Sequence, residues 1–259
     1  MFAQGTAVYD SIPSPLPGNV VSEGFQCCQN FEFGDEIKLE PSTPRRAGYV
    51  TLVMSDWAKH SDYPSMPAAG YAHPITLNVY DNAVNAAAHA PMKTVTTTFT
   101  IPWRPENDPS CPDGMAWKAG DGNCYHGVAF KITFDVRSWN LDLPEQFIYG
   151  IAYNTNTWGY SPLGVPGPYE SLNVGLNETP PVSVGTDVDP DSIYRNYLGN
   201  GFTAESGWTP YTPAIQFRTF ALPAVASDCK NGAWQNLVRA NFTPFKNQGD
   251  CVSYVNTGK

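Results

Sequence analysis

Apolar and polar side chains alternate along several short stretches of the chain, with the period of two that is expected of strands with one buried face. The clearest stretches are residues 75–79, 94–101 and 128–136. In residues 94–101, Val95, Phe99 and Ile101 share one face, whereas the other face carries only threonine. The pattern predicts that one face of each strand enters a core and that the other meets water.

Residues 49–54 and 146–153 are largely apolar or aromatic on both faces, which is typical of strands in the middle of a sheet or beneath a covering loop. About ten short strands with no helix-period stretch between them indicate antiparallel pairing. We therefore expect an all-β fold, a jelly-roll-like sandwich of two antiparallel sheets, and a closed barrel is the competing architecture. The other predicted strands lie near residues 6–9, 20–26, 36–39, 171–176 and 214–220.

Three long loops separate these strands, at residues 56–73, 102–127 and 154–213, and long loops often carry function. We expect residues 1–222 to form the sandwich and residues 223–259 to form a linker and a small appendage, with residues 232–238 as the candidate for two helical turns. An appendage of ~30 residues is too small to hold a core alone. We therefore expect it to be closed by a disulfide and to dock on the sandwich.

The composition narrows the class of protein. The chain has 259 residues, a net charge of -9 and only 15% charged residues, with 22 glycines and 24 prolines, which suits short strands and turns better than helical bundles. The absence of a basic stripe that would displace phosphate counterions argues against nucleic acid as a partner. No stretch approaches the ~20 apolar residues of a membrane-spanning helix.

Six cysteines indicate the compartment. Cys111 with Cys124, and Cys229 with Cys251, are expected to form disulfides that contribute roughly 3 kcal/mol each, which points to an oxidising environment. The adjacent Cys27 and Cys28 are expected to stay unbridged, because neighbouring side chains on a strand point to opposite faces. The opening MFAQG reads as a start methionine on a mature secreted protein whose leader has been removed.

Several segments resemble a group of uncharacterised secreted bacterial proteins. The resemblance implies an exported bacterial β-sandwich with a Cys-closed C-terminal element, and it implies no activity. Cys27 and Cys28 depart from the small and hydroxyl residues that the group has at this place. The segments in the main domain are YD (residues 9–10), IPSPLPGNV (12–20), EFGD (32–35), HPITL (73–77), IYGIAYN (148–154) and VGTDVDPD (184–191), and those in the tail are DCKNGAW (228–234) and FKNQGDCV (245–252).

The acidic run Asp187, Asp189 and Asp191 is the candidate metal site, because carboxylates spaced by two can converge on one Ca²⁺ ion. It is not an EF-hand, since Ser192 stands where glycine is needed and Leu198 where glutamate is needed. A calcium site of another type would combine the run with a second segment, at Asp35 or Glu36. The alternative is a turn in which aspartates bond their own backbone and proline fixes the bend.

Aromatic residues of the long loops are the candidate ligand-binding residues. Flat rings with a polar handle suit the faces of sugars, and they equally suit covering the open ends of a sandwich. We expect Trp158, Tyr160 and Trp208 to form a platform for polysaccharide or another extracellular surface. The set called the loop aromatics below comprises Trp57, Tyr63, Trp103, Trp117, Tyr125, Trp158, Tyr160, Tyr169, Trp208 and Tyr211.

Sequence support for catalysis is weak. The motifs of serine hydrolases, zincins and nucleotide-binding enzymes are absent. A copper or zinc site from His60, His73 and His126 is a minor hypothesis, with His73 interpreted mainly as a structural residue. Paired carboxylates need no fixed spacing, so a glycosidic acid and base remain open. The candidates are Asp56, Glu170, Asp187 and Glu205.

The function expected from the sequence is non-catalytic binding of polysaccharide or an extracellular surface, with calcium as a stabilising ion. An extracellular polysaccharide hydrolase or lyase that uses loop carboxylates is the first alternative. A subunit of an extracellular assembly is the second, because the tail and the proline-rich segment of residues 9–19 suit contacts with other molecules.

Overall fold

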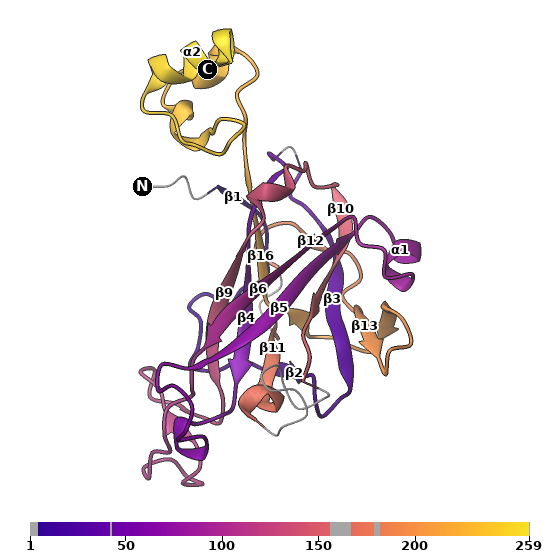
Figure 1. Ribbon diagram of the computed structural model, residues 1–259, viewed down its shortest axis with the longest axis vertical. Coiled ribbons are helices and arrows are strands. Elements are labelled where there is room, and N and C mark those ends of the chain that lie inside the picture. Colours follow the sequence, from indigo (N-terminus) through magenta and orange to yellow (C-terminus); the bar gives the residue numbers. More distant parts are fainter. Residues whose placement is uncertain (1–4, 42, 156–166, 179–181, 259) are drawn as a thin grey trace.

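Two antiparallel β-sheets form the body of the protein in the computed structural model (Figure 1). The structure describes residues 5–41, 43–155, 167–178 and 182–258. The predicted all-β sandwich is confirmed, and so is the disulfide of the C-terminal appendage. Among the described residues, no helix combines the length and the apolar character needed to cross a membrane.

The first sheet is built around β4 (Arg46–Asp56), which the sequence placed in the middle of a sheet. Strand β9 (Val128–Asp135) pairs along one edge of β4, and β16 (Ile215–Phe220) and then β11 (Leu172–Asn177) pair along the other. Strand β1 extends the sheet beyond β16, while β2 and β15 pair with β11. These outer strands are β1 (Thr6–Asp10), β2 (Ser22–Gly24) and β15 (Thr212–Pro213).

In the second sheet, β10 (Gln146–Ala152) lies between β3 (Asn30–Lys38) and β5 (Tyr71–Tyr80). This central position explains why β10 is apolar on both faces. Strand β6 pairs with β5, and β12 and β13 pair successively with β3. The remaining strands are β6 (Lys93–Ile101), β12 (Thr186–Asp187), β13 (Ser192–Tyr197) and β14 (Thr203–Ser206), with a separate small hairpin of β7 (Trp117–Lys118) and β8 (Cys124–Tyr125).

The core lies between the inner faces of the two sheets. Phe217 of β16 meets Phe147 of β10 with ring centroids 5.2 Å apart. Strand β6 shows the predicted alternation, with its all-threonine face exposed and Ile101 buried. Burial of such side chains is the main source of stability in a sandwich.

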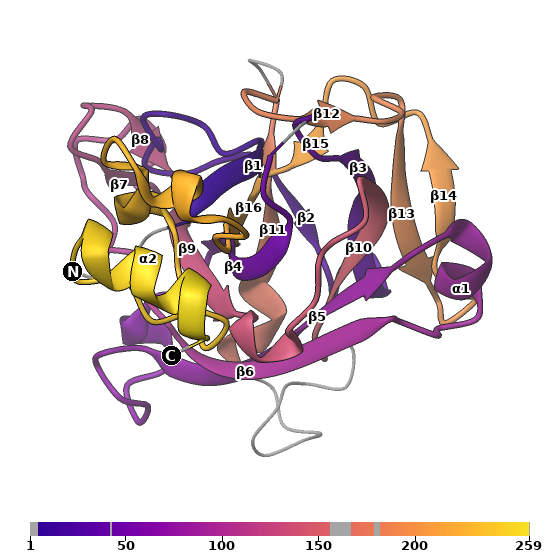
Figure 2. The ribbon, with the colours of Figure 1, turned by 90° about the horizontal axis from the view of Figure 1, so that it is seen from above.

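A second, smaller core covers part of the outer face of the second sheet. Tyr80, Ile148 and Tyr194 pack there with Ala86 of the short helix α1 (Ala83–Ala87) and with Phe202. The β13–β14 hairpin supplies one wall and lies at the side of the molecule that carries α1 (Figure 2). The sequence had assigned this hairpin to a loop, because β13 carries apolar residues on both faces.

The appendage follows an extended linker and stands at one end of the long axis of the molecule (Figure 1). Its helix is α2 (Gln248–Thr257), which Asn247 caps by accepting a hydrogen bond from the backbone N–H of Asp250. The helical turns expected at residues 232–238 amount to one 3₁₀ turn, η5 (Ala233–Asn236). The other 3₁₀ turns are η1 (His60–Asp62), η2 (Arg137–Trp139), η3 (Pro168–Ser171) and η4 (Ala226–Cys229).

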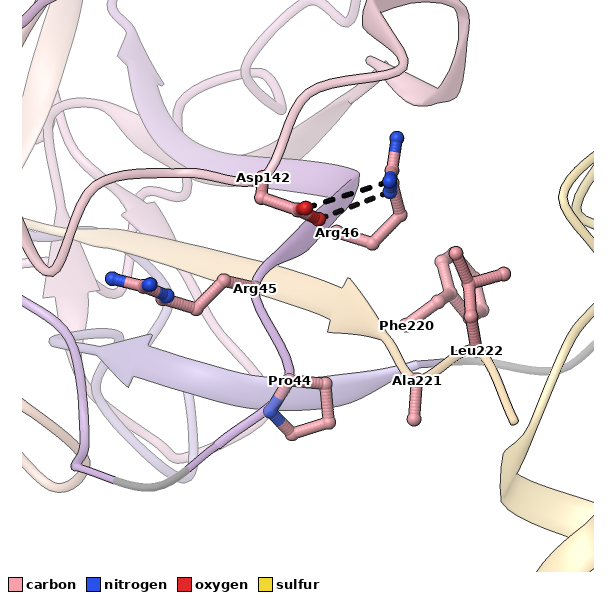
Figure 3. Close-up of a pocket in the computed structure, with 7 residues that line it drawn as sticks. All are labelled: Pro44, Arg45, Arg46, Asp142, Phe220, Ala221 and Leu222. Atoms are coloured by element: carbon pink, nitrogen blue, oxygen red, sulfur yellow. Dashed lines mark hydrogen bonds and ion pairs between the residues drawn. The ribbon is translucent and has the colours of Figure 1, made fainter. Parts of the chain in front are cut away.

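The appendage docks on the sandwich through an edge-on contact between Phe242 and Phe220, whose ring centroids are 5.7 Å apart. The backbone N–H of Val238 also donates to the carbonyl of Ala221 at 3.0 Å. Beside this junction an open pocket of ≈ 360 Å³ is lined by residues 44–46, Asp142 and residues 220–222, with an ion pair of Arg46 and Asp142 in its wall (Figure 3). The pocket is the groove left where the linker leaves the last strand.

We predict that Gly34→Ala strongly destabilises the sandwich. Gly34 of β3 lies opposite Gly150 of β10, and a Cβ atom at Gly34 would stand 1.8 Å from the carbonyl oxygen of Tyr149. Since this atom belongs to the neighbouring strand, relief requires breaking the ladder, and we expect a loss of about 3 kcal/mol or more in the free energy of unfolding. Urea denaturation measures it.

Gly120→Ala is the matched control, because a Cβ atom there meets nothing within 4 Å. Its free energy of unfolding should stay within about 0.5 kcal/mol of the parent value. Equal stability of the two variants would show that the approach of β3 to β10 is not a constraint on the fold.

Candidate functional site

The acidic run lies along the edge of the second sheet. Asp187 pairs with Ile37 in the β12–β3 ladder, and its carboxylate accepts a hydrogen bond from the hydroxyl of Thr212. Asp189 and Asp191 are exposed, whereas Asp187 is half-buried and points inward. Within the described ranges, no three His, Cys, Asp or Glu side chains gather as they do at a metal centre. The structure therefore does not bring the three predicted ligands together.

Asp191 holds the segment through hydrogen bonds from residues 207–209. Its carbonyl accepts hydrogen bonds from the backbone N–H groups of Gly207 and Trp208, at 2.8 and 3.0 Å. Its carboxylate accepts a further bond of 3.0 Å from the hydroxyl of Thr209. The run thus ties the start of β13 to the segment that follows β14.

Asp187 comes instead into the neighbourhood of Asp35, one of the two partners suggested by the sequence. Asp35 is 2% exposed and lies opposite Tyr149 in the β3–β10 ladder. Tyr9 of β1 approaches from the first sheet. We call Tyr9, Asp35, Tyr149 and Asp187 the interior acid cluster.

The segment that carries Asp187 joins the two sheets. The backbone N–H of Ser183 donates to the carbonyl of Asp10 on β1 at 2.7 Å, and the N–H of Asp10 donates to the carbonyl of Val184 at 2.9 Å. Two residues later, β12 pairs with β3 of the second sheet, and Thr212 of the first sheet donates to Asp187. The interior acid cluster therefore lies at the seam between the sheets.

Burial raises the pKa of Asp35 well above its ordinary value, and the charge of Asp187 raises it further. Burial also raises the pKa of Asp187, although the bond from Thr212 opposes this. The pKa of Tyr149 is raised by burial and then by the charge of Asp35. The direction is the same in each case because an uncompensated negative charge is costly inside the fold.

The predicted aromatic platform is not assembled in the part of the chain that the structure describes. Trp158 and Tyr160 lie outside the described residues. Trp208 is half-buried and packs on Phe33 of the core, with ring centroids 5.3 Å apart. Of the eight loop aromatics that are described, only Trp57 is exposed, at 45% of its surface.

Trp57 forms an exposed surface with His126. The two rings are nearly parallel, at 13°, with centroids 6.0 Å apart. The Trp57 indole N–H donates to the hydroxyl of Ser55 at 3.1 Å, and this hydroxyl donates to the Asn19 side chain at 2.8 Å. His126 in turn pairs with Asp113 at 2.8 Å. We call Trp57, His126, Asn19 and Asp113, together with the buried Ser55 that bonds to the indole, the Trp57 surface.

Two constraints hold the loops around the Trp57 surface. Arg104 is buried, and its guanidinium donates to the carbonyls of Trp57 and Met115, each at 3.1 Å, so it links the loop after β4 to the loop after β6. The Cys111–Cys124 disulfide closes the second loop, as predicted. The role of Arg104 was not predicted, because a single arginine in the segment PWRP (residues 102–105) has no distinctive pattern.

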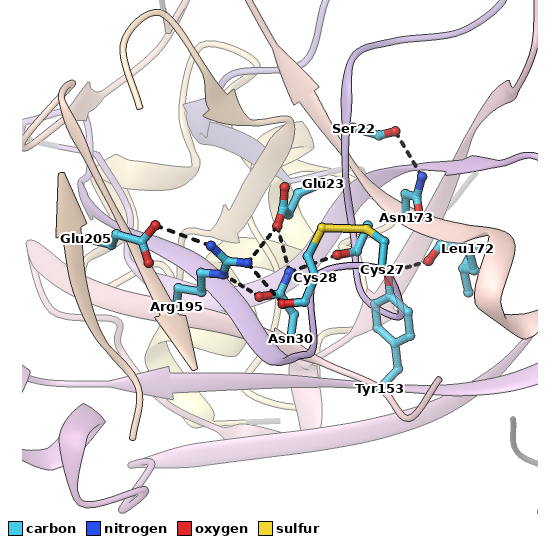
Figure 4. The surroundings of a disulfide bond; sticks show 11 residues. Ser22, Glu23, Cys27, Cys28, Asn30, Tyr153, Leu172, Asn173, Arg195 and Glu205 are labelled. Atoms are coloured by element: carbon cyan, nitrogen blue, oxygen red, sulfur yellow. Dashed lines mark hydrogen bonds and ion pairs between the residues drawn. A yellow bond between two sulfur atoms is a disulfide. The ribbon is translucent and has the colours of Figure 1, made fainter. Parts of the chain in front are cut away.

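Cys27 and Cys28 form a disulfide, so the prediction that they stay unbridged is wrong (Figure 4). The prediction assumed a strand over residues 20–26, whereas β2 ends at Gly24 and the cysteines lie in a turn. Adjacent side chains of a turn need not point to opposite faces. All six cysteines are therefore bonded, which indicates an oxidising compartment.

Arg195 anchors this turn to β13. It donates to the carbonyl of Cys28 at 3.1 Å and forms ion pairs of 3.3 Å with Glu23 and Glu205 (Figure 4). An adjoining pocket of ≈ 360 Å³ is lined by Gln26, Gln29, Phe31 and Leu198. Glu205, one of the carboxylates considered for catalysis, is thus the partner of an arginine.

The candidate histidine site is not assembled. His60 contacts the carbonyl of Met66, His126 pairs with Asp113, and His73 is fully buried on β5. Burial lowers the pKa of His73 to about 4, so it stays neutral in the folded protein. This fits the structural interpretation of His73.

The other carboxylates considered for catalysis are buried or half-buried within the fold. Asp56 is fully buried and accepts a bond of 2.9 Å from the hydroxyl of Tyr71. Burial raises the pKa of Asp56 well above its ordinary value. Glu170 lies half-buried in η3, and Asp187 belongs to the interior acid cluster.

Comparison with known proteins gives no further constraint. No protein-family model, no curated protein sequence and no solved structure matches the chain.

We predict that Asp35→Asn becomes more stable, relative to the parent, as pH rises. The pKa of Asp35 in the folded protein lies above its unfolded value of about 3.9, so the folded state holds more protons between the two values. The free energy of unfolding of the parent must fall as pH rises through this window, and the asparagine lacks this titration. His73 titrates equally in both proteins and cancels in the difference.

Urea unfolding from about pH 5 to about pH 8, in buffer with EDTA, measures this difference. We expect it to grow by about 1 kcal/mol or more across the range. A difference that does not change with pH would show that Asp35 titrates as an ordinary exposed carboxyl group.

Proposed function

We propose that the protein is an exported, non-catalytic binding protein that recognises polysaccharide through the Trp57 surface. The observation that carries the proposal is the exposure of Trp57 beside His126 on loops that are fixed by Arg104 and a disulfide. The proposal keeps the class of ligand expected from the sequence. It moves the binding site from the Trp208 region to Trp57, which directly follows β4.

The chemistry of the Trp57 surface suits a sugar. An indole face offers apolar area to the C–H groups of a pyranose ring, and rings have few torsions to immobilise on binding. Asn19, His126 and Asp113 surround the indole with groups that donate and accept hydrogen bonds. An exposed ring among such polar groups favours a hydroxyl-rich chain over a small apolar ligand.

Rigidity of the loops supports binding. A surface that is already ordered loses little conformational entropy when the ligand arrives. Gly127 lets the loop lie directly beneath the indole, since a Cβ atom there would stand 2.8 Å from the Trp57 nitrogen. The loops are therefore held close to one another before any ligand binds.

Export is part of the proposal. The three disulfides suit an oxidising compartment, and the resemblance to secreted bacterial proteins points to the extracellular space. Polysaccharide of a cell surface or of the surrounding matrix is the ligand that this location offers.

We predict that Trp57→Ala weakens polysaccharide binding at least tenfold, a loss of about 1.4 kcal/mol or more. Tyr197→Ala is the matched control, because Tyr197 is an aromatic residue of the same 45% exposure on β13, beside the pocket at Cys27 and Cys28. Affinity electrophoresis against a polysaccharide panel, followed by calorimetry, gives the comparison.

If Tyr197→Ala loses polysaccharide binding while Trp57→Ala binds as the parent does, the Trp57 surface is rejected as the site. If no polysaccharide of the panel binds the parent protein, polysaccharide is rejected as the ligand. Release of reducing sugar from a retained polysaccharide would favour the hydrolase or lyase, and concentration-dependent large particles in light scattering would favour the assembly subunit.

We also predict that the Cys111→Ser/Cys124→Ser double variant binds the same polysaccharide about tenfold more weakly, while its sandwich stays folded. The two cysteines are 13 positions apart, and loss of their disulfide removes roughly 3 kcal/mol of stabilisation. We expect the loss to act first on the order of the loop that carries His126. Circular dichroism checks the fold, and calorimetry checks the affinity. Unchanged affinity would show that the order of this loop does not contribute to binding.

A further inference from the structure

Four oxygen atoms of the interior acid cluster have no hydrogen-bond partner among the described residues. They are the hydroxyls of Tyr9 and Tyr149, Oδ2 of Asp35 and Oδ1 of Asp187. Asp35 is 2% exposed, and both tyrosines are fully buried. Buried polar atoms in folded proteins nearly always have partners, so a group of four at one place requires an explanation.

The four side chains come together at the seam between the sheets. Tyr149 lies opposite Asp35 in the β10–β3 ladder, and Asp187 lies opposite the residue two positions after Asp35, on the same face. The Tyr9 ring reaches this place from β1, since it would stand 3.0 Å from a Cβ atom at Gly185, two residues before Asp187. Burial raises the pKa of Tyr9 and of Tyr149, and the charges of both aspartates raise it further.

Hydrogen bonds within the interior acid cluster do not account for its arrangement. Either tyrosine hydroxyl has a proton to donate to a carboxylate, and neither bonds to one. A hydroxyl group that binds a calcium ion turns a lone pair towards the ion and its proton away from it, so it makes no hydrogen bond with the carboxylates that bind the same ion at about 2.3–2.6 Å. The only described bond to the Asp35 carboxylate is that from the backbone N–H of Glu36, at 2.8 Å to Oδ1.

We propose that Asp35 and Asp187, together with the hydroxyl oxygens of Tyr9 and Tyr149, bind a calcium ion between the two sheets. All the donors are oxygen atoms, which favours a hard cation over zinc or copper. Two carboxylates balance the charge of a divalent ion, and water completes the coordination, because Asp187 is only half-buried. Magnesium fits less well, since it requires a near-ideal octahedron.

This ligand set differs from the one expected from the sequence. Asp189 and Asp191 are exposed and contribute negative charge to the approach to the site rather than coordination. The cation removes the penalty of burying Asp35 and joins strands of both sheets. Calcium therefore stabilises the sandwich itself and acts independently of the Trp57 surface.

Calcium titration of the EDTA-treated full chain tests the proposal. We expect one ion to bind and the melting temperature to rise by roughly 5–10 °C at a hundredfold excess over the Kd. Magnesium should give a smaller rise. Asp35→Asn and Asp187→Asn keep the shape of the side chains, and each should lose the calcium response.

Asp189→Asn and Asp191→Asn are matched controls, because they remove exposed carboxylates of the same run and should keep the calcium response. Terbium in place of calcium gives a readout that does not depend on stability. Its emission under tyrosine excitation should be strong in the parent and at least several-fold weaker in Tyr149→Phe, which removes only the hydroxyl oxygen.

The proposal is overturned if the parent neither binds calcium nor sensitises terbium. It is also overturned if the calcium response survives Asp35→Asn, or if it is lost only in Asp189→Asn or Asp191→Asn. An Asp35→Asn variant that melts higher than a calcium-insensitive parent would show that the interior acid cluster holds a shared proton or water, and the cation would be rejected.

Discussion

A carboxyl group that is removed from water is costly to ionise, and the described residues include three that are buried, Glu32, Asp35 and Asp56. The outer core compensates Glu32 with hydrogen bonds from Asn78 and from the hydroxyl of Tyr80. Asp56, at the end of β4, accepts a hydrogen bond from the hydroxyl of Tyr71, the first residue of β5. The described hydrogen bonds to the Asp35 carboxyl group come from one donor, the backbone N–H of Glu36, and burial raises the pKa of Asp35 well above its ordinary value.

The central strand of the first sheet connects the core to the surface. The last residues of β4 alternate, so Asp56 points into the interior while Ser55 supports the indole of Trp57, the next residue along the chain. Pairing of β4 on both edges fixes this direction. The position of the exposed ring is therefore set by the same ladder that orders the core.

The strands that could be predicted from the sequence are those with one buried and one exposed face. Strands β5, β6 and β9 were found because apolar and polar residues alternate along them. Strand β13 was missed because Ile193 packs in the main core and Tyr194 in the second one, which removes the alternation. Helix α2 was missed for a related reason, since only Cys251 of its residues is buried and its apolar stripe is weak.

The candidate sites were predicted only in part. The sequence singled out the acidic run and suggested Asp35 as a partner, but Tyr9 and Tyr149 are brought to Asp35 by strand register, which a single sequence does not specify. The Trp57 surface was missed because ten loop aromatics have similar sequence surroundings. Which of them stays exposed depends on the packing of the loops around Arg104.

The seam between the sheets has a consequence for how the chain folds. Strand β1 pairs with β16, and Ser183 bonds to Asp10 across 173 positions of sequence. The first strand cannot reach its place until the last strand of the sandwich has been synthesised, and pairings between distant residues are slow to form. The sandwich is thus completed only after residues 215–220, which form β16, have been synthesised, so the two ends of this fold become ordered together.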